Sequence, residues 1–156
     1  MTVEESIAKL EANAAQFAAC IVSFPEELFL APIDAWAPRD VLAHLIGWNR
    51  YTMEGSELLL RGELPPYFAD AGDDFAEVNA VSVRKYASKD RRELLGQLEV
   101  SLQELKEFLH SLAPDDWEAG VPYKQYLITV ENSVQALSDD YANHREQIER
   151  WAQTRG

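Results

Sequence analysis

The sequence predicts an all-α protein, a four-helix bundle in which one long connection crosses over between the second and third main helices. Three observations support this prediction. Four segments of twenty or more residues place apolar side chains at alternating steps of four and three, the spacing of one buried helix face. Proline and glycine gather between these segments, and no stretch shows the sustained alternation of a half-buried strand. Four such helices in 156 residues most simply form one bundle.

The first helix is expected over residues 3–24, where the apolar residues follow the bundle spacing. Thr2 and Glu5 lie three residues apart, which is the spacing of a capping box at a helix start. Pro25 ends this helix, because proline cannot donate the backbone hydrogen bond that a helix interior needs. Residues 25–32 are then a connection.

The second helix is expected over residues 38–61, with a proline in its first turn and a glycine directly after its end. The connection that follows is long. Residues 62–73 contain two prolines and two glycines, and a short extra helix is expected over residues 74–87. Such a connection can cross the end of the bundle, so an order other than simple up-down-up-down is allowed.

The third helix is expected over residues 89–112, where leucines keep the bundle register. Residues 113–128 contain two prolines and a glycine and are expected to be irregular. The fourth helix is expected over residues 129–153. Its inward-facing stripe consists of Val130, Val134, Leu137, Tyr141, His144, Ile148 and Trp151. A histidine therefore takes a place that leucine usually holds.

Composition and charge narrow the classes of function. The formal net charge is -13, and nucleic-acid binders need a basic patch, so no nucleic-acid partner is expected. No stretch approaches the roughly 20 apolar residues of a membrane span, and the N-terminus lacks the features of a signal peptide. The single cysteine, Cys20, cannot form an internal disulfide, which suits a reducing compartment. We therefore expect one cytoplasmic domain over residues 1–156, without a membrane partner.

Polar side chains that can bind metal occupy two of the predicted buried stripes. His144 lies on the inward stripe of the fourth helix, and Asp140 lies one turn before it on the same side. His44 holds a similar place on the second helix. Buried polar groups need partners or a metal, and bundles commonly build metal sites from facing helices. These three residues are therefore the candidate site.

Each of the three residues also has a purely structural interpretation. His144 would then be a neutral core histidine, hydrogen-bonded to Asp140 or Tyr141. Asp140 would be a surface carboxylate in an acidic segment. His44 would pair with Asp40, one turn before it, either as a plain structural pair or to orient the imidazole. The residues alone leave both interpretations open.

Two motifs carry a resemblance to a known family. The second helix is introduced by Trp36-Ala-Pro-Arg-Asp40-Val-Leu-Ala-His44-Leu-Ile-Gly-Trp48, and the fourth contains Asp140-Tyr-Ala-Asn-His144. Together they are similar to the DinB-like superfamily, and most similar to its ClbS/DfsB branch, also called DUF1706. This resemblance implies the DinB/YfiT-like metalloenzyme fold, a four-helix bundle with a long crossover that is often a homodimer.

The resemblance also implies what the site binds. Many DinB-like proteins hold a divalent metal with one histidine on the second helix and a His-x-x-x-His pair on the fourth. His44 matches the first of these ligands and His144 the last, whereas Asp140 replaces the middle histidine. Two imidazoles and one carboxylate are competent ligands for Zn, Ni, Mn or Fe, and they leave positions open for water or substrate. The pocket residues expected beside this site are Trp48, Tyr141 and Asn79.

Two classes of function follow from these expectations. In the first, the chain is a metal-dependent enzyme, a hydrolase or thiol transferase that acts on a small reactive metabolite. In the second, it is a metal-free, ClbS-like resistance protein that binds or hydrolyses an electrophilic compound. A non-catalytic scaffold is a further alternative. The expected partners are a small-molecule ligand or substrate and a second copy of the chain.

Overall fold

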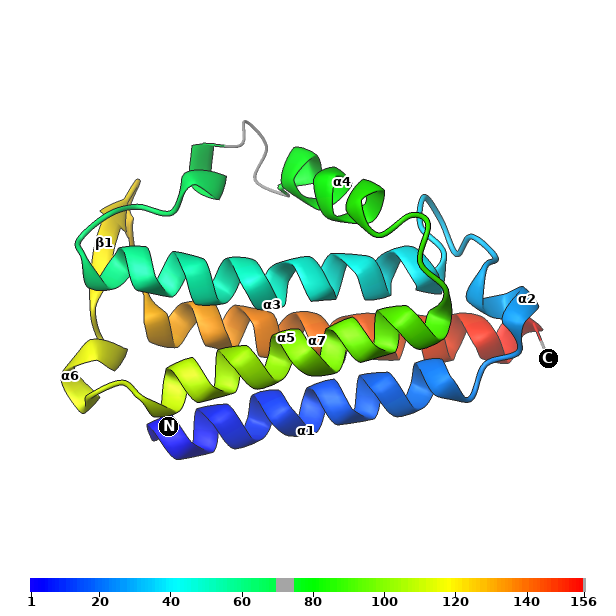
Figure 1. The fold of residues 1–156 in the computed structure, drawn as a ribbon, viewed down its shortest axis with the longest axis horizontal. Helices are drawn as coiled ribbons and strands as arrows, with labels where there is room; N and C mark the ends of the chain where they lie inside the picture. Colours follow the sequence, from blue (N-terminus) through cyan, green and yellow to red (C-terminus); the bar gives the residue numbers. More distant parts are fainter. Residues whose placement is uncertain (70–74, 156) are drawn as a thin grey trace.

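The computed structural model describes residues 1–69 and 75–155, and four long helices form its body (Figure 1). These are α1 (Val3–Val22), α3 (Pro38–Leu60), α5 (Arg91–His110) and α7 (Val130–Arg155). The shorter helices are α2 (Glu26–Phe29), the 3-10 helix η1 (Pro66–Ala69), α4 (Ala76–Lys85) and α6 (Pro114–Trp117). Two strands, β1 (Gly120–Tyr123) and β2 (Tyr126–Thr129), precede α7. The predicted four-helix bundle with a helix in its crossover is confirmed.

Polar side chains define where the helices begin. The Thr2 hydroxyl accepts a hydrogen bond from the Glu5 backbone N–H at 3.1 Å, and the Glu5 carboxylate accepts one from the Thr2 N–H at 3.0 Å. This is the capping box expected at the start of α1. At the start of α3, the Asp40 carboxylate accepts from the Ala37 N–H at 3.0 Å. Asp40 is therefore engaged as a helix cap, and His44 has other partners, described below.

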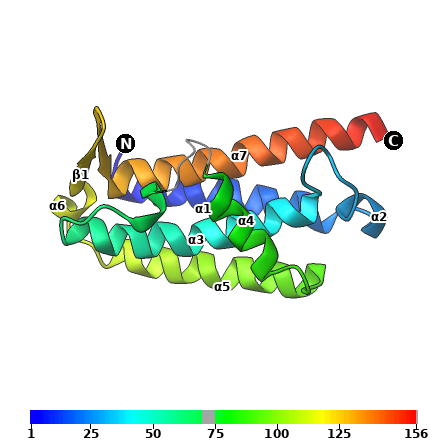
Figure 2. The ribbon, with the colours of Figure 1, turned by 90° about the horizontal axis from the view of Figure 1, so that it is seen from above.

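The crossover gives the bundle an order other than up-down-up-down. Helices α1 and α7 start at the end that carries the strands, whereas α3 and α5 start at the opposite end (Figures 1 and 2). Parallel neighbours therefore pack side by side, α1 with α7 and α3 with α5, and α3 also contacts the antiparallel α7. The crossover runs between α3 and α5, and its helix α4 lies against the outer side of α3.

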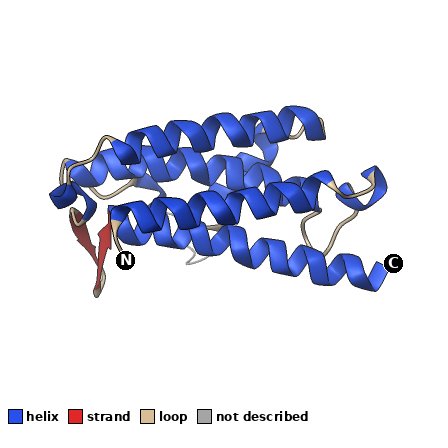
Figure 3. Ribbon diagram, turned by 90° about the horizontal axis from the view of Figure 1, so that it is seen from below, coloured by secondary structure: helices blue, strands red, loops and turns tan. Residues whose placement is uncertain are grey.

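The connection expected to be irregular over residues 113–128 is instead partly a β-hairpin (Figure 3). β1 pairs antiparallel with β2, with Gly120 opposite Thr129 and Tyr123 opposite Tyr126. Lys124 turns the chain with a positive φ of 54°. Each strand has four residues, too few for a strand alternation to stand out in the sequence.

The core is tied together by polar groups as well as by apolar packing. Tyr141 on α7 is fully buried, and its hydroxyl donates to Asn49 Oδ1 on α3 at 2.7 Å. The Asn49 amide in turn donates to the Ser101 hydroxyl on α5 at 3.0 Å. Three of the four long helices are thus joined by buried hydrogen bonds whose partners are all satisfied.

No helix in the described part of the chain is long and apolar enough to cross a bilayer.

Two glycines on α3 allow the crossover to rest directly on that helix. A Cβ atom placed on Gly47 would lie 2.1 Å from Ser82 Oγ, on α4. A Cβ atom on Gly55 would lie 2.5 Å from the Tyr67 hydroxyl, on η1. Both separations are far below van der Waals contact, so only glycine permits these approaches. The absence of two side chains from α3 therefore sets how close the crossover comes.

Replacing Gly47 with alanine is expected to destabilise the protein by pushing α4 away from α3. Alanine gains up to about 1 kcal/mol in helix propensity, but overpacking against a buried residue such as Ser82 costs about 1–3 kcal/mol. Urea unfolding followed by circular dichroism should show a lower midpoint than wild type. Gly96→Ala on α5 is the matched control, because a Cβ there meets nothing within 4 Å, and its midpoint should rise. A rise for both variants would contradict close packing at Gly47.

Candidate metal centre

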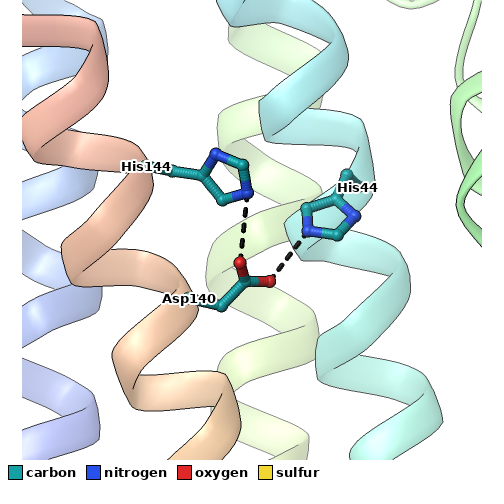
Figure 4. A group of neighbouring side chains, drawn as sticks. All are labelled: His44, Asp140 and His144. Carbon is teal, nitrogen blue, oxygen red and sulfur yellow. Dashed lines mark hydrogen bonds and ion pairs between the residues drawn. The ribbon is translucent and has the colours of Figure 1, made fainter. Parts of the chain in front are cut away.

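His44, Asp140 and His144 converge between two antiparallel helices, α3 and α7 (Figure 4). The Asp140 carboxylate lies between the two imidazoles. Its Oδ2 atom is 2.8 Å from His44 Nε2, and its Oδ1 atom is 3.1 Å from His144 Nε2. One ligand atom from each residue lies within 4.8 Å of the others. The structure therefore brings together the three residues that the sequence proposed as one site.

The three side chains lie at the border between the core and a cavity. His44 is buried, whereas the side chains of Asp140 and His144 keep exposed fractions of 33% and 20%. All three line a cavity of about 660 Å³. A volume of this size is typical of small-molecule sites. The polar cluster is therefore accessible to a ligand from one side and supported by the core from the other.

Asp140 is held in its charged form. Burial alone would raise the pKa of this carboxyl, because the charged form loses water. Hydrogen bonds from His144 and His44, together with the electrostatic interaction with the two imidazoles, outweigh burial and hold the pKa of Asp140 well below its usual range. Asp140 is therefore an anion at neutral pH and an anionic donor for any cation in the site.

Trp48 and Asn79 determine which nitrogen of His44 faces Asp140. The Trp48 indole N–H, which can only donate, lies 2.6 Å from Asn79 Oδ1. This atom must therefore be the amide oxygen. The same oxygen lies 3.0 Å from His44 Nδ1, so it accepts the hydrogen of that nitrogen. In the neutral ring, His44 Nε2 then carries a lone pair directed at Asp140.

A lone pair on His44 Nε2 and the carboxylate oxygen 2.8 Å away would repel each other unless a proton or a cation lies between the two atoms. Either Nε2 carries a second proton, or a cation is shared by the nitrogen and the oxygen. Metal-ligating histidines commonly donate their other ring N–H to a protein oxygen, as His44 does to Asn79. Two imidazoles and a carboxylate suit Zn, Ni, Mn or Fe. The residues present thus fit a divalent ion.

An aromatic wall, formed by Trp48, Tyr67, Phe68 and Phe75, lines another side of the cavity. The Trp48 ring lies 5.0 Å from that of Tyr67 and 5.4 Å from that of Phe75, measured between centroids. Phe68 lies 5.6 Å from Phe75. Three of these four residues belong to the crossover, so the connection between α3 and α5 builds a large part of the cavity.

A profile of the DinB superfamily matches residues 9–148. The chain belongs to the DinB superfamily. This membership accounts for the four-helix bundle described above. No curated protein sequence matches the chain.

Solved structures of low sequence identity share this DinB fold. The colibactin self-resistance protein ClbS, in complex with a double-stranded DNA, has a TM-score of 0.81 and 16% identity, over 97% of this chain and 96% of ClbS. DfsB, described as a sibling lethal factor precursor, has a TM-score of 0.77 and 12% identity, over 99% and 97%. YfiT from Bacillus subtilis, described as a probable metal-dependent hydrolase, has a TM-score of 0.75 and 18% identity, over 99% and 87%. These likenesses establish the fold.

The structure places two of the three predicted pocket residues at the cavity and the third in the core. Trp48 and Asn79 line the cavity, whereas Tyr141 is a core residue whose ring packs edge-on against Phe17 at 5.7 Å. Sequence reasoning missed the contribution of the crossover to the aromatic wall. The available signal was the concentration of aromatic residues within 67–75, in a connection rich in proline and glycine. It also missed that Asn79 bonds directly to His44.

Cys20 lies outside the DinB cavity and is expected to react slowly. Burial, with a smaller contribution from the charge of Glu149, raises the pKa of the Cys20 thiol to about 11. Since the thiolate is the nucleophile, we expect a reaction about a hundredfold slower at pH 8 than that of a free thiol of pKa about 8.5. The rate should keep rising as the pH approaches 11. Release of thionitrobenzoate from an aromatic disulfide measures it, and a rate equal to that of free cysteine would contradict the burial.

Proposed function

We propose that this DinB protein is a metal-dependent enzyme that acts on a small electrophilic molecule, as a hydrolase or a thiol transferase. The observation that carries the proposal is the placement of three ligand-type groups, His44, Asp140 and His144, on the wall of a cavity large enough for a small molecule. The orientation of His44 by Asn79 supports it. The description of YfiT, which shares the fold, as a metal-dependent hydrolase is consistent with it.

Each group of residues in the site would have a separate role in the proposed reaction. When bound, a divalent ion supplies positive charge that polarises an electrophile or lowers the pKa of a water or thiol. Asp140 offsets part of that charge, and His44 is held in a ligating orientation by Asn79. The aromatic wall keeps bulk water from one side of the cavity, which strengthens electrostatic interactions within it.

The nucleophile would come from outside the chain. None of the described residues that line the cavity is a cysteine. Ser133 lines it, but its hydroxyl donates to the Thr129 backbone oxygen at 2.8 Å, and within the described residues no base is among its hydrogen-bond partners. A water molecule or a low-molecular-weight thiol therefore fits the site better than a covalent enzyme intermediate does.

Elemental analysis of untagged protein, purified without chelators, tests the proposal. Near-stoichiometric zinc, nickel, manganese or iron would support it and would indicate which ion to use in activity assays. A metal-free protein that also resists reloading with all four ions would overturn it.

Size-exclusion chromatography with light scattering on the same sample tests the homodimer that the family resemblance implies.

A metal-free resistance protein is the second candidate, and one observation favours it. Both oxygens of Asp140 already bond to a histidine, at 2.8 and 3.1 Å, and a proton on His44 Nε2 would satisfy the cluster without an ion. ClbS, which has the same fold, is described as a self-resistance protein. In this case the cavity should bind or hydrolyse an electrophile in the presence of a chelator. Failure to bind either metal or electrophile would leave the scaffold alternative.

We expect this chain not to bind duplex DNA at about 0.15 M salt. The ClbS structure contains DNA, so the fold itself is compatible with such a partner, and the expectation rests on the net charge of -13 here. Fluorescence anisotropy of a labelled duplex should stay unchanged up to protein concentrations of about 10⁻⁴ M, the range of non-specific binding. Saturable binding below that concentration would show that a local basic surface overrides the overall charge.

A further inference from the structure

Away from His44 and His144, the cavity presents charge of one sign to a ligand. Asp139 and Asp140 are the acidic members of its lining, and none of the described lining residues is a lysine or an arginine. Lys9 lies 3.9 Å from Asp139, but its side chain is 41% exposed and does not line the cavity. A negatively charged group placed away from the metal ligands would therefore meet no cationic side chain and would lose its water.

Two neutral polar side chains at the start of α7, Asn132 and Ser133, line the cavity and are engaged within the protein. The Asn132 side chain accepts from the Thr129 N–H at 2.9 Å and donates to the Leu127 oxygen at 2.8 Å. The Ser133 hydroxyl donates to the Thr129 oxygen. These hydrogen bonds cap the start of α7 and engage the Ser133 O–H and one of the two Asn132 amide N–H donors, so fewer donors remain to solvate a carboxylate, sulfonate or phosphate in the cavity.

The aromatic wall is uncharged and fixed in place. Burial raises the pKa of the Tyr67 hydroxyl to about 12, so the phenol stays neutral under ordinary conditions. The Tyr67 ring packs over Gly55 of α3 and lies 5.0 Å from the Trp48 ring, which limits its movement. Rings arranged edge-to-face in this way offer a rigid apolar surface against which another ring can pack.

We propose that the ligand of this cavity is a small molecule with an aromatic or similarly apolar body and no negative charge. Its body lies on the aromatic wall, and its reactive end faces His44, Asp140 and His144. The assignment of the reactive end rests on the proposed function. The choice of the body rests only on the aromatic wall and on the charge of the lining, so it can be tested without the metal.

Two fluorescent probes with the same ring system test this ligand class. N-phenyl-1-naphthylamine is uncharged, and 8-anilinonaphthalene-1-sulfonate adds one sulfonate to the same skeleton. The full chain is titrated with each probe, both loaded with metal and after treatment with a chelator. The uncharged probe is expected to bind at least about tenfold more tightly in both forms. Equal affinities, a preference for the sulfonate, or binding of neither probe would overturn the proposal.

Three variants test whether the probe binds in the cavity. Phe68→Ala removes one ring of the aromatic wall and should weaken the uncharged probe several-fold. Ala136→Lys adds a cation at an exposed position of the lining and should shift the preference toward the sulfonate. Tyr126→Ala removes an exposed aromatic ring from the hairpin, outside the cavity, and should change neither affinity. Loss of binding in Tyr126→Ala with retention in Phe68→Ala would place the probe on the surface and overturn the proposal.

Folding and metal content separate the possible failures. Circular dichroism shows whether Phe68→Ala keeps its helices, and Ala136→Lys tests charge selection independently if it does not. Tighter binding of the uncharged probe than of the sulfonate by chelator-treated protein would support the ligand class even if elemental analysis found no metal. Stoichiometric metal without probe selectivity would support the proposed function and reject the ligand class.

Discussion

Replacing His144 with alanine is expected to remove the divalent ion from the purified protein, and His44→Ala is expected to do the same. Each substitution deletes one of three ligand-type groups that lie within 4.8 Å of one another. Losing a residue that merely supports a ligand costs 10- to 100-fold in metal affinity, so losing a ligand should cost more than about 100-fold. Metal per chain, measured by mass spectrometry after identical purifications, checks the expectation.

His110→Ala is the matched control for these two variants. It removes the one histidine of the sequence outside the proposed site, which is exposed at the end of α5 and does not line the cavity. Its metal content should equal that of wild type. Equal loss from His110→Ala and His144→Ala would show that the ion is bound adventitiously. Thermal unfolding of all three variants without metal separates a damaged site from a damaged fold.

Asn79→Leu is expected to lower metal affinity by about 10- to 100-fold while leaving every proposed ligand in place. The Asn79 oxygen accepts from His44 Nδ1 at 3.0 Å and from the Trp48 indole at 2.6 Å. Without that oxygen, neither the ring orientation nor the tautomer of His44 is fixed. The indole N–H is also left without this acceptor next to an apolar side chain, which adds a cost in stability.

Asn79→Asp separates positioning from packing. The aspartate keeps an acceptor oxygen and adds negative charge, which should preserve or strengthen metal binding by making His44 a more basic ligand. Competition with a chromophoric chelator measures the dissociation constants of the three proteins. Equal weakening in Asn79→Leu and Asn79→Asp would mean that Asn79 matters only for its shape and would contradict its role in orienting His44.

The long helices could be predicted because each one carries its own evidence. Apolar residues at every third or fourth position define a buried face without reference to the rest of the chain. The hairpin lacked such evidence, since its two strands have four residues each and are stabilised by pairing with one another and by the start of α7. Elements this short depend on tertiary context, which local periodicity does not contain.

In the candidate site too, some residues could be placed from helix register and others could not. His44, Asp140 and His144 could be grouped because helix register placed the two histidines on inward stripes and Asp140 one turn before His144, and the motifs that carry the family resemblance contain all three. Tyr141 was expected in the pocket because it shares a stripe with His144, whereas the structure places it in the core. Register alone does not tell the centre of the core from the edge of a cavity.

The contact between Asn79 and His44 depends on how α4 lies on α3, which is set by the space that Gly47 leaves for Ser82. That space is a property of two packed helices and has no counterpart in the spacing of residues along either one. The tautomer of His44 follows from the same packing, through Trp48 and Asn79. Sequence reasoning could therefore name candidate ligands but could not say how one of them is oriented.

His44 and Asp140 stand 96 positions apart in the chain, and only folding brings them within 2.8 Å. An ion or ligand that needs both residues can bind the folded chain but not the unfolded one, so its binding energy adds to the free energy of unfolding. At a free concentration of one hundred times its Kd, this gain is about 2.7 kcal/mol. An occupied site would thus act as a reversible cross-link between α3 and α7, and the melting temperature of the protein would report how fully that cross-link is occupied.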